Sequence, residues 1–258
     1  MTTPAPSSRS VIVTGATGGM GGDFVRAFAA TGADVVASDL HRSSAAGEEL
    51  AAEVTAVGGG RVSFVPADIT SDDDLAALVE HATATSGGVD VLVNNAGIFM
   101  DLGAKRPMTE VTNDVWDQVM TVNARGTWQA IKAVVPAMRA RGGGRIVNMA
   151  SSTVYNGVAG FVHYVASKAA VDGITRVAAR ELGPDGITVN ALAPGLVETP
   201  AAIAMNPPEY LQRAAQGRFI QRGMVPGDLV SALLWLAAPE SGFVTGQTII
   251  IDGGQLQA

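Results

Sequence analysis

The chain has 258 residues, of which 47% are hydrophobic and 16% charged, and it contains no cysteine. A chain of this length buries roughly three-quarters of the surface that its unfolded form exposes, so one domain can form without disulfides or a structural metal. The lack of cysteine excludes thiol catalysis and cysteine-ligated metal sites, and the net charge of −7 gives no basic field for wrapping nucleic acid.

The sequence carries no membrane signal that we can identify. It has no run of about 18 apolar residues that would predict a transmembrane helix. The start, MTTPAPSSRS, lacks a basic region followed by an apolar one. We therefore expect a cytoplasmic protein that binds neither membranes nor nucleic acid. Residues 1–9 are expected to form a flexible arm, and residues 10–258 a single domain.

Short β-branched runs alternate along the chain with longer alanine-rich stretches of helical period. Because the runs are apolar throughout, we expect strands that helices cover on both faces. The alternation predicts a three-layer α/β fold with a doubly wound parallel sheet. The predicted strands are Val11–Val13, Val35–Ala37, Val62–Val65, Val89–Val93, Ile146–Met149, Ile187–Ala191 and Thr248–Ile251, and the predicted helices include Met20–Ala30, Ala45–Ala56 and Asp72–Ala84.

A glycine-rich turn, Thr14-Gly15-Ala16-Thr17-Gly18-Gly19-Met20-Gly21, follows the first predicted strand and precedes a predicted helix. Glycines there let the backbone turn sharply and approach a pyrophosphate, which the N-terminus of the helix then binds. Ordinary connections between a strand and a helix also contain such turns, so the motif alone is weak evidence.

Polar residues at the ends of the next three strands favour a dinucleotide. Asp39 ends the second strand, where a carboxylate accepts hydrogen bonds from both hydroxyls of the adenosine ribose. The same charge repels a 2′-phosphate, so NAD is favoured over NADP, and Arg42 is expected at the solvated surface. Asp68 is placed to accept a hydrogen bond from the adenine amino group. Asn94-Asn95-Ala96-Gly97 suits packing beside a planar ring.

One of only three tyrosines and one of only three lysines stand together in Tyr164-Val165-Ala166-Ser167-Lys168, at the start of a predicted helix that runs to about Leu182. Residues four apart share a helix face, so the ammonium lies near the phenol. A nearby cation lowers the pKa of a tyrosine, as a general acid/base near neutral pH requires. The alternative is a partly buried tyrosine with an unrelated lysine.

Two more polar residues complete this set. Ser151 closes a predicted strand, so its hydroxyl is placed to donate to a substrate carbonyl oxygen as charge develops there; Ser152 is the competing candidate. Asn123 interrupts an apolar stripe of helical spacing, and a buried amide must find partners. One interpretation is that Asn123 causes a local helix kink or forms a hydrogen bond to a neighbouring carbonyl. The other is that it holds an ordered water in a proton path to Lys168.

Together these residues resemble the classical short-chain dehydrogenase/reductase family. The resemblance extends from about Ser10 to Asp252-Gly253-Gly254. It implies a Rossmann fold with a seven-stranded sheet, nicotinamide in the syn orientation, and hydride transfer between the cofactor and a secondary alcohol or ketone. The matching pieces are TGxxxGxG at Thr14–Gly21, Asp39, Asp68, Asn94–Gly97, Asn123, Ser151, Tyr164, Lys168, and Pro194-Gly195 followed by Thr199.

The resemblance also implies individual roles. Tyr164 is the general acid/base, and Ser151 orients and polarises the carbonyl. Lys168 binds the nicotinamide ribose and depresses the pKa of the tyrosine, while Asn123 completes the proton relay. The implied NAD site consists of Gly15, Thr17, Gly18, Gly19, Met20, Gly21, Asp39, Leu40, Asp68, Ile69, Asn95, Ala96, Gly97, Tyr164, Lys168, Pro194, Gly195, Val197 and Thr199. The last four of these hold the carboxamide end of the cofactor.

Similar proteins are commonly homotetramers, and residues 112–139 and 162–182 resemble their helical dimer faces. Residues 198–222 resemble a substrate lid, whose three prolines fit an irregular loop better than a long helix. A metal site is not expected, because the three histidines are scattered.

The candidate pocket residues Thr153, Tyr155, Val158, His163 and Leu196 are mostly apolar or neutral. They suit an uncharged ketone or an aryl-alkyl alcohol, and they loosely resemble those of secondary aromatic alcohol dehydrogenases of this family.

Three other functions share parts of the pattern. A 3-oxoacyl-thioester reductase shares every motif. For this function we expect basic residues near the pocket, to bind a carrier's acidic face or phosphopantetheine, and Arg125, Arg139 and Arg176 are candidates. A non-catalytic NAD-binding protein would keep the fold without turnover, and the intact set of four polar residues argues against it. An extended-type sugar-nucleotide epimerase is disfavoured because no substrate domain follows residue 258.

Overall fold

A computed structural model of the chain describes residues 8–99 and 105–256. Its seven-stranded sheet has the order β3-β2-β1-β4-β5-β6-β7, and every neighbouring pair is parallel. The strands are β1 (Ser10–Thr14), β2 (Asp34–Asp39), β3 (Val62–Pro66), β4 (Val91–Asn94), β5 (Gly144–Met149), β6 (Ile187–Pro194) and β7 (Thr248–Ile251). All seven predicted strands are confirmed, with small shifts at their ends.

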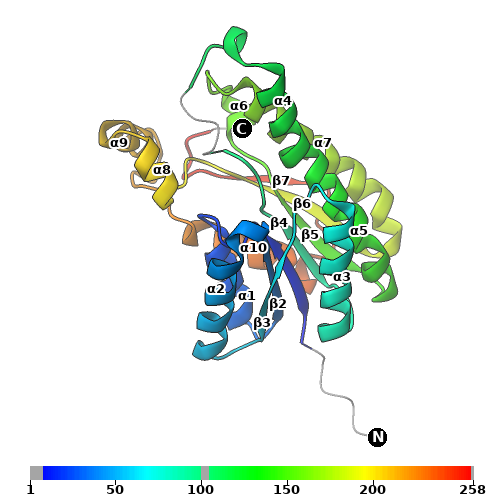
Figure 1. The fold of residues 1–258 in the computed structure, drawn as a ribbon. Helices are drawn as coiled ribbons and strands as arrows, with labels where there is room; N and C mark the ends of the chain where they lie inside the picture. Colours follow the sequence, from blue (N-terminus) through cyan, green and yellow to red (C-terminus); the bar gives the residue numbers. More distant parts are fainter. Residues whose placement is uncertain (1–7, 100–104, 257–258) are drawn as a thin grey trace, which may run out of the picture.

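Helices cover both faces of the sheet, which confirms the three-layer Rossmann-type architecture (Figure 1). One face carries α1 (Gly21–Ala30), α2 (Ser44–Val57) and α10 (Gly227–Ala237). The other carries α3 (Asp72–Ser86), α5 (Thr127–Ala140) and α7 (Val162–Leu182), with α4 (Asn113–Val119) beside them. Shorter helices, α6 (Thr153–Asn156), α8 (Pro200–Met205) and α9 (Pro208–Gln216), lie beyond the carboxyl ends of the strands.

The central strands are apolar throughout because each face of the sheet packs against helices. In β1, Val11 and Val13 belong to the core on one face, while Ile12 belongs to the core on the other. The neighbouring β4 divides its residues in the same way. Each buried valine, leucine or isoleucine contributes about 1.5–3 kcal/mol relative to leaving it exposed. This double burial explains why an unbroken apolar run correctly predicted a central parallel strand.

The N-terminal segment meets the sheet before β1 begins. The part of the expected arm at residues 1–7 lies outside the described residues. Ser8 donates a hydrogen bond to Asp34 Oδ2 at 2.6 Å, and Arg9 donates to the carbonyl of Ala237. Among the described residues, none of the helices has the length and apolar character needed to span a bilayer.

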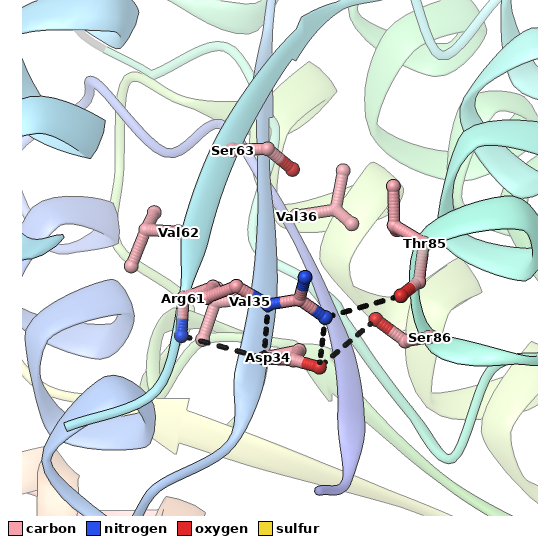
Figure 2. A pocket seen from close by; sticks show the side chains of 8 residues that line it. All are labelled: Asp34, Val35, Val36, Arg61, Val62, Ser63, Thr85 and Ser86. Atoms are coloured by element: carbon pink, nitrogen blue, oxygen red, sulfur yellow. Dashed lines mark hydrogen bonds and ion pairs between the residues drawn. The ribbon is translucent and has the colours of Figure 1, made fainter.

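A small pocket of about 160 Å³ lies at the amino ends of β2 and β3 (Figure 2). Arg61 and Ser86 both donate to the carboxylate of Asp34, at 3.1 and 3.3 Å. The Arg61 guanidinium lowers the pKa of Asp34 to about 2. These groups satisfy one another, and they lie at the opposite end of the strands from the residues predicted to carry chemistry.

The contact between Gly47 of α2 and Phe64 of β3 leads to a stability prediction. A Cβ placed on Gly47 would lie 2.1 Å from the Phe64 ring, so the ring would have to shift. Helix propensity alone favours alanine by ~1 kcal/mol, but overpacking costs ~1–3 kcal/mol. We expect Gly47→Ala to lower the free energy of unfolding by up to ~2 kcal/mol, measured by urea denaturation.

Gly227→Ala, at the first residue of α10, is the matched control. Within the described part of the chain, nothing lies within 4 Å of a Cβ placed there. This variant should unfold within ~0.5 kcal/mol of the wild type. If both variants gained stability, helix propensity would outweigh the Gly47–Phe64 contact and our interpretation would be wrong.

Candidate active site

The residues predicted to carry chemistry meet at the carboxyl ends of the strands. The chain leaves β1 toward β2 and β3 on one side, and then returns to place β4 on the other side of β1. Such a reversal opens a crevice beyond the strand ends, where open α/β sheets bind their ligands. The glycine-rich turn follows β1, and the segment from Asn95 to Gly97 follows β4, so the two lie on either side of this crevice.

The glycine-rich turn is tightly packed. Gly15 has a φ of +64°, and a Cβ placed on it would lie 2.8 Å from Cα of Ala96. A Cβ on Gly21 would lie 2.2 Å from the Gly15 carbonyl oxygen. Side chains are therefore excluded at both positions. No side chain among the described residues caps the N-terminus of α1. The N–H of Gly21 donates to the Gly18 carbonyl at 3.2 Å, and the N–H groups that follow it in the first turn are suited to an anion.

Asp39 and Asn95 tie the turn to the adjacent strands. Asp39 Oδ2 accepts hydrogen bonds from the backbone N–H and the hydroxyl of Thr17, at 3.0 and 2.7 Å. Asn95 Nδ2 donates to the carbonyls of Thr14 and Gly15, at 3.1 and 2.9 Å. These bonds hold the carboxylate that the sequence assigns to the ribose at the wall of the crevice. The neighbouring Asp68 carboxylate accepts instead from Thr70, at 2.8 and 2.7 Å.

Lys168 is buried and fixed to the central sheet. Its ammonium donates to the carbonyl of Met149, the last residue of β5, at 2.7 Å. A Cβ placed on Gly97 would lie 3.5 Å from this nitrogen and 3.1 Å from Asn123 Oδ1. The structure therefore brings Lys168 and Asn123 together around the backbone of Gly97.

Asn123 lies in a π-helix, η4 (Met120–Gly126), between α4 and α5. Its side chain accepts from the N–H of Ile98 at 2.7 Å and donates to the Ile98 carbonyl at 3.0 Å. It also donates to the hydroxyl of Ser167 at 3.1 Å. The buried amide thus finds its partners in a local distortion and in the segment after β4. A π-turn is a frequent feature of functional sites, and the apolar stripe in the sequence did not reveal it.

Ser151 lies just beyond β5, close enough to Tyr164 to change the pKa of the phenol. Ser151 Oγ accepts from the hydroxyl of Thr153 at 2.9 Å and from its N–H at 3.3 Å. Its hydroxyl also lowers the pKa of Tyr164 against the effect of burial. The competing residue, Ser152, donates its backbone N–H to the carbonyl of Pro194 at 3.0 Å. The structure therefore brings the side chain of Ser151 to the phenol.

The expectation that Lys168 lowers the pKa of Tyr164 is wrong for this structure. Removal from water raises the pKa of Tyr164 to about 12. Burial also lowers the pKa of the Lys168 ammonium to about 8. The ammonium is held by the Met149 carbonyl, 5.8 Å from the centre of the tyrosine ring, and desolvation dominates both groups.

Two of the residues expected to line the substrate pocket, Tyr155 and His163, differ in their hydrogen bonding. The hydroxyl of Tyr155 donates to Asp172 of α7 at 2.7 Å. His163 is buried, and neither ring nitrogen has a hydrogen-bond partner among the residues described. Burial and the nearby Arg106 both lower the pKa of His163, so this imidazole is neutral at physiological pH.

The segment 198–222 is more ordered than expected. Two short helices, α8 and α9, replace the predicted irregular loop. Pro200 and Pro208 each occupy the first helical position, where the missing N–H costs nothing. Thr199 caps α8 by accepting from the N–H of Ala202 at 3.2 Å. The prolines therefore correctly excluded one long helix but did not exclude two short ones.

Sequence reasoning missed an aromatic contact at the phenol. The ring of Phe99 lies 4.6 Å from that of Tyr164, centre to centre. Phe99 is one of seven phenylalanines, and it belongs to no motif. The contact joins the segment after β4 to the start of α7, so no local spacing predicted it.

Comparison with known proteins shows similarity along almost the whole chain. A family model described as enoyl-(acyl carrier protein) reductase matches residues 15–255. The short-chain dehydrogenase/reductase eriH of Hericium erinaceus is 38% identical, covering 95% of this chain and 96% of that protein. The 3-oxoacyl-(acyl-carrier-protein) reductase FabG of Thermotoga maritima is 36% identical, with coverage of 94% and 96%. A short-chain type dehydrogenase/reductase structure from Mycobacterium ulcerans has a TM-score of 0.89 and 31% identity, covering 96% of this chain and 89% of that one.

The pKa of Lys168 predicts a pH-dependent stability. Burial lowers this pKa from 10.5 to about 8, so in that window the unfolded chain binds more protons than the folded protein. The free energy of unfolding should therefore rise with pH across the window. We expect the wild type to gain on the order of 1–3 kcal/mol relative to Lys168→Met between about pH 7.5 and 10, measured by urea denaturation without added cofactor. Parallel curves for the two proteins would show that Lys168 is not desolvated as described.

Proposed function

Because this chain belongs to the short-chain dehydrogenase/reductase family, whose enzymes act on CH–OH groups with NAD(P), we propose that it transfers a hydride between NAD and a secondary alcohol or ketone. The observation that carries this proposal is the convergence of three side chains at the crevice. Ser151 lowers the pKa of the Tyr164 phenol against the effect of burial. One helical turn further along α7, the Met149 carbonyl holds the Lys168 ammonium.

The crevice fits a dinucleotide. The turn after β1 excludes side chains at Gly15 and Gly21, as the close approach of a pyrophosphate requires. Asp39, held by Thr17, is placed to accept bonds from ribose hydroxyls and to repel a 2′-phosphate, which supports NAD over NADP. The exposed backbone of Gly97 leaves room beside Lys168 for the second ribose. When bound, the nicotinamide supplies or accepts the hydride.

We propose that Ser151 polarises the carbonyl. Its oxygen accepts a hydrogen bond from the Thr153 hydroxyl, so its own O–H is left to donate elsewhere. A substrate carbonyl oxygen placed between Ser151 and Tyr164 would receive that bond as negative charge develops on it. Thr153 is thus a positioning residue for the serine proton.

The proton on Tyr164 then completes the chemistry. A pKa of about 12 keeps the phenol protonated, which suits donation to the developing alkoxide during reduction. In the direction of oxidation the phenol must lose its proton, and the Ser151 hydroxyl, which lowers the pKa of Tyr164 against the effect of burial, favours the phenolate. Asn123, bonded to Ile98 and Ser167, is proposed to complete the relay to solvent.

We also propose a homotetramer whose dimer faces are the stretches 112–139 and 162–182. These helices expose large apolar side chains, since Trp128 is 50% exposed and Val177 is 58% exposed. Exposed apolar surface of this kind is typical of subunit interfaces. Size-exclusion chromatography with light scattering tests the assembly.

One specific relative favours a second candidate function, 3-oxoacyl-thioester reduction. The Thermotoga maritima relative carries that activity in its name and matches 94% of this chain. Of the basic residues considered for a carrier or coenzyme, Arg139 is paired with Asp185 at 2.8 Å, whereas Arg125 and Arg176 are exposed. Comparing turnover of acetoacetyl-CoA with that of an aryl ketone distinguishes the two functions.

Replacing Tyr164 with phenylalanine tests the acid/base role. Loss of a general acid/base typically costs 10²–10⁴-fold, so we expect Tyr164→Phe to lower kcat at least a hundredfold. NADH binding, followed by its fluorescence, should stay within a fewfold of the wild type because the ring remains. Near-normal turnover in this variant would refute the assignment.

The cofactor preference is tested with Asp39→Asn. This change removes the charge that repels a 2′-phosphate but nearly keeps the size of the side chain. We expect the ratio of kcat/KM for NAD to that for NADP to fall on the order of tenfold, equivalent to ~1.4 kcal/mol. Asp185→Asn removes the same charge at the other end of the sheet and should leave the ratio unchanged. Equal ratios in wild type and Asp39→Asn would remove Asp39 from the ribose site.

A further inference from the structure

An aromatic cluster lies against the phenol that we propose as the acid/base. The rings of Phe99 and Tyr164 are 4.6 Å apart and tilted by 47°. Phe99 also contacts Phe161, the residue before α7, at 5.3 Å and 57°. Phe161 is buried, but Phe99 is only half-buried. One side of Phe99 therefore packs in the cluster while another side remains accessible beside the reacting residue.

Lys105 extends this cluster to the lid. Its ammonium lies 5.7 Å from the centre of the Phe161 ring and 4.7 Å from that of Tyr210 in α9. It also donates a hydrogen bond to the Tyr210 hydroxyl at 3.2 Å. A cation over two ring faces attracts both. We call Phe99, Phe161 and Tyr210, joined by Lys105, the aromatic wall.

Backbone hydrogen bonds on both sides of the aromatic wall hold it in place. Ile98, next to Phe99, exchanges two hydrogen bonds with the Asn123 amide, at 2.7 and 3.0 Å. On the far side, the N–H of Arg106 donates to the Gly160 carbonyl at 3.3 Å. A ring on such a fixed backbone is preorganised, so a ligand that stacks on it does not have to order it first.

We propose that Phe99 determines substrate specificity, and that the aromatic wall selects ketones whose carbonyl carries an aryl ring over saturated ketones of the same size. This inference rests on the proposed function and names the substrate class for the same site. Burial of apolar area alone does not separate a phenyl from a cyclohexyl group. Paired aromatic rings gain interaction beyond area burial, equivalent to about two- to tenfold in affinity.

The test compares kcat/KM for acetophenone and cyclohexyl methyl ketone, two ketones of matched size. The wild type should favour acetophenone by at least about twofold. Phe99→Leu, which keeps an apolar side chain but removes the ring, should lower this ratio by about two- to tenfold, chiefly through the KM for acetophenone. Phe99→Tyr restores a ring and should restore the ratio.

Two control variants separate Phe99 from other effects. Lys105→Met removes the cation but keeps the ring of Phe99, so we expect KM to rise for both ketones with their ratio unchanged. Phe243→Leu replaces a fully exposed phenylalanine near the start of β7, far along the chain from the wall, and should change nothing. A ratio that falls as far in Lys105→Met as in Phe99→Leu would assign specificity to the cation and overturn the proposal.

Other outcomes also decide the question. Equal turnover of the two ketones by the wild type, or an unchanged ratio in Phe99→Leu, overturns the role of Phe99 while leaving the proposed oxidoreductase function intact. Turnover of acetoacetyl-CoA with neither ketone accepted overturns the aryl class and supports the thioester reductase. Inactivity on all three compounds, with NADH still bound, would defeat the proposed function itself.

Discussion

The hydrogen bond from the buried Lys168 ammonium to the Met149 carbonyl fixes the geometry of the candidate site. It joins α7, which carries Tyr164, to the end of β5, which Ser151 follows two residues later. An ammonium without such a partner would carry a large desolvation cost in this environment. The same bond therefore lets a charged group be buried where α7 packs against the sheet. It ties the helix that carries Tyr164 to the strand that Ser151 follows.

Desolvation at this junction has opposite effects on its two titratable groups. It lowers the pKa of the lysine to about 8 and raises that of the tyrosine to about 12. Both shifts favour the neutral form, which is the direction in which burial shifts an ionisable group. The phenol therefore keeps its proton over the physiological range, and a charge that develops on a nearby oxygen would strengthen its bonds to Ser151 and Tyr164. Electrostatic stabilisation of such charge is larger in a dry site than in water.

The sequence predicted the elements whose evidence is local and periodic. Unbroken apolar runs predicted the strands, and the i to i+4 spacing of Tyr164 and Lys168 predicted that the two residues share a face of α7. Features that depend on contacts between distant segments were not predicted. The π-helix around Asn123 places its amide on Ile98, 25 residues earlier in the chain, and the pKa of Tyr164 depends on burial that no spacing reveals. Helices α8 and α9 were not predicted because the prolines of this segment favour an irregular loop, although proline starts both helices.

Ile98, whose backbone bonds to the Asn123 amide, is the neighbour of the proposed specificity residue Phe99. Substrate choice can therefore vary at a position next to the bonds that hold the site. Asn123 holds the backbone of Ile98 through bonds that do not involve the side chain at position 99. A change at Phe99 therefore alters the surface beside Tyr164 without removing the hydrogen bonds that position Asn123. Tyr210 reaches the same wall from α9, a separate segment of the chain. Substrate preference can thus change at the wall while the bonds around Lys168 remain, because the two sets of contacts share a backbone but not side chains.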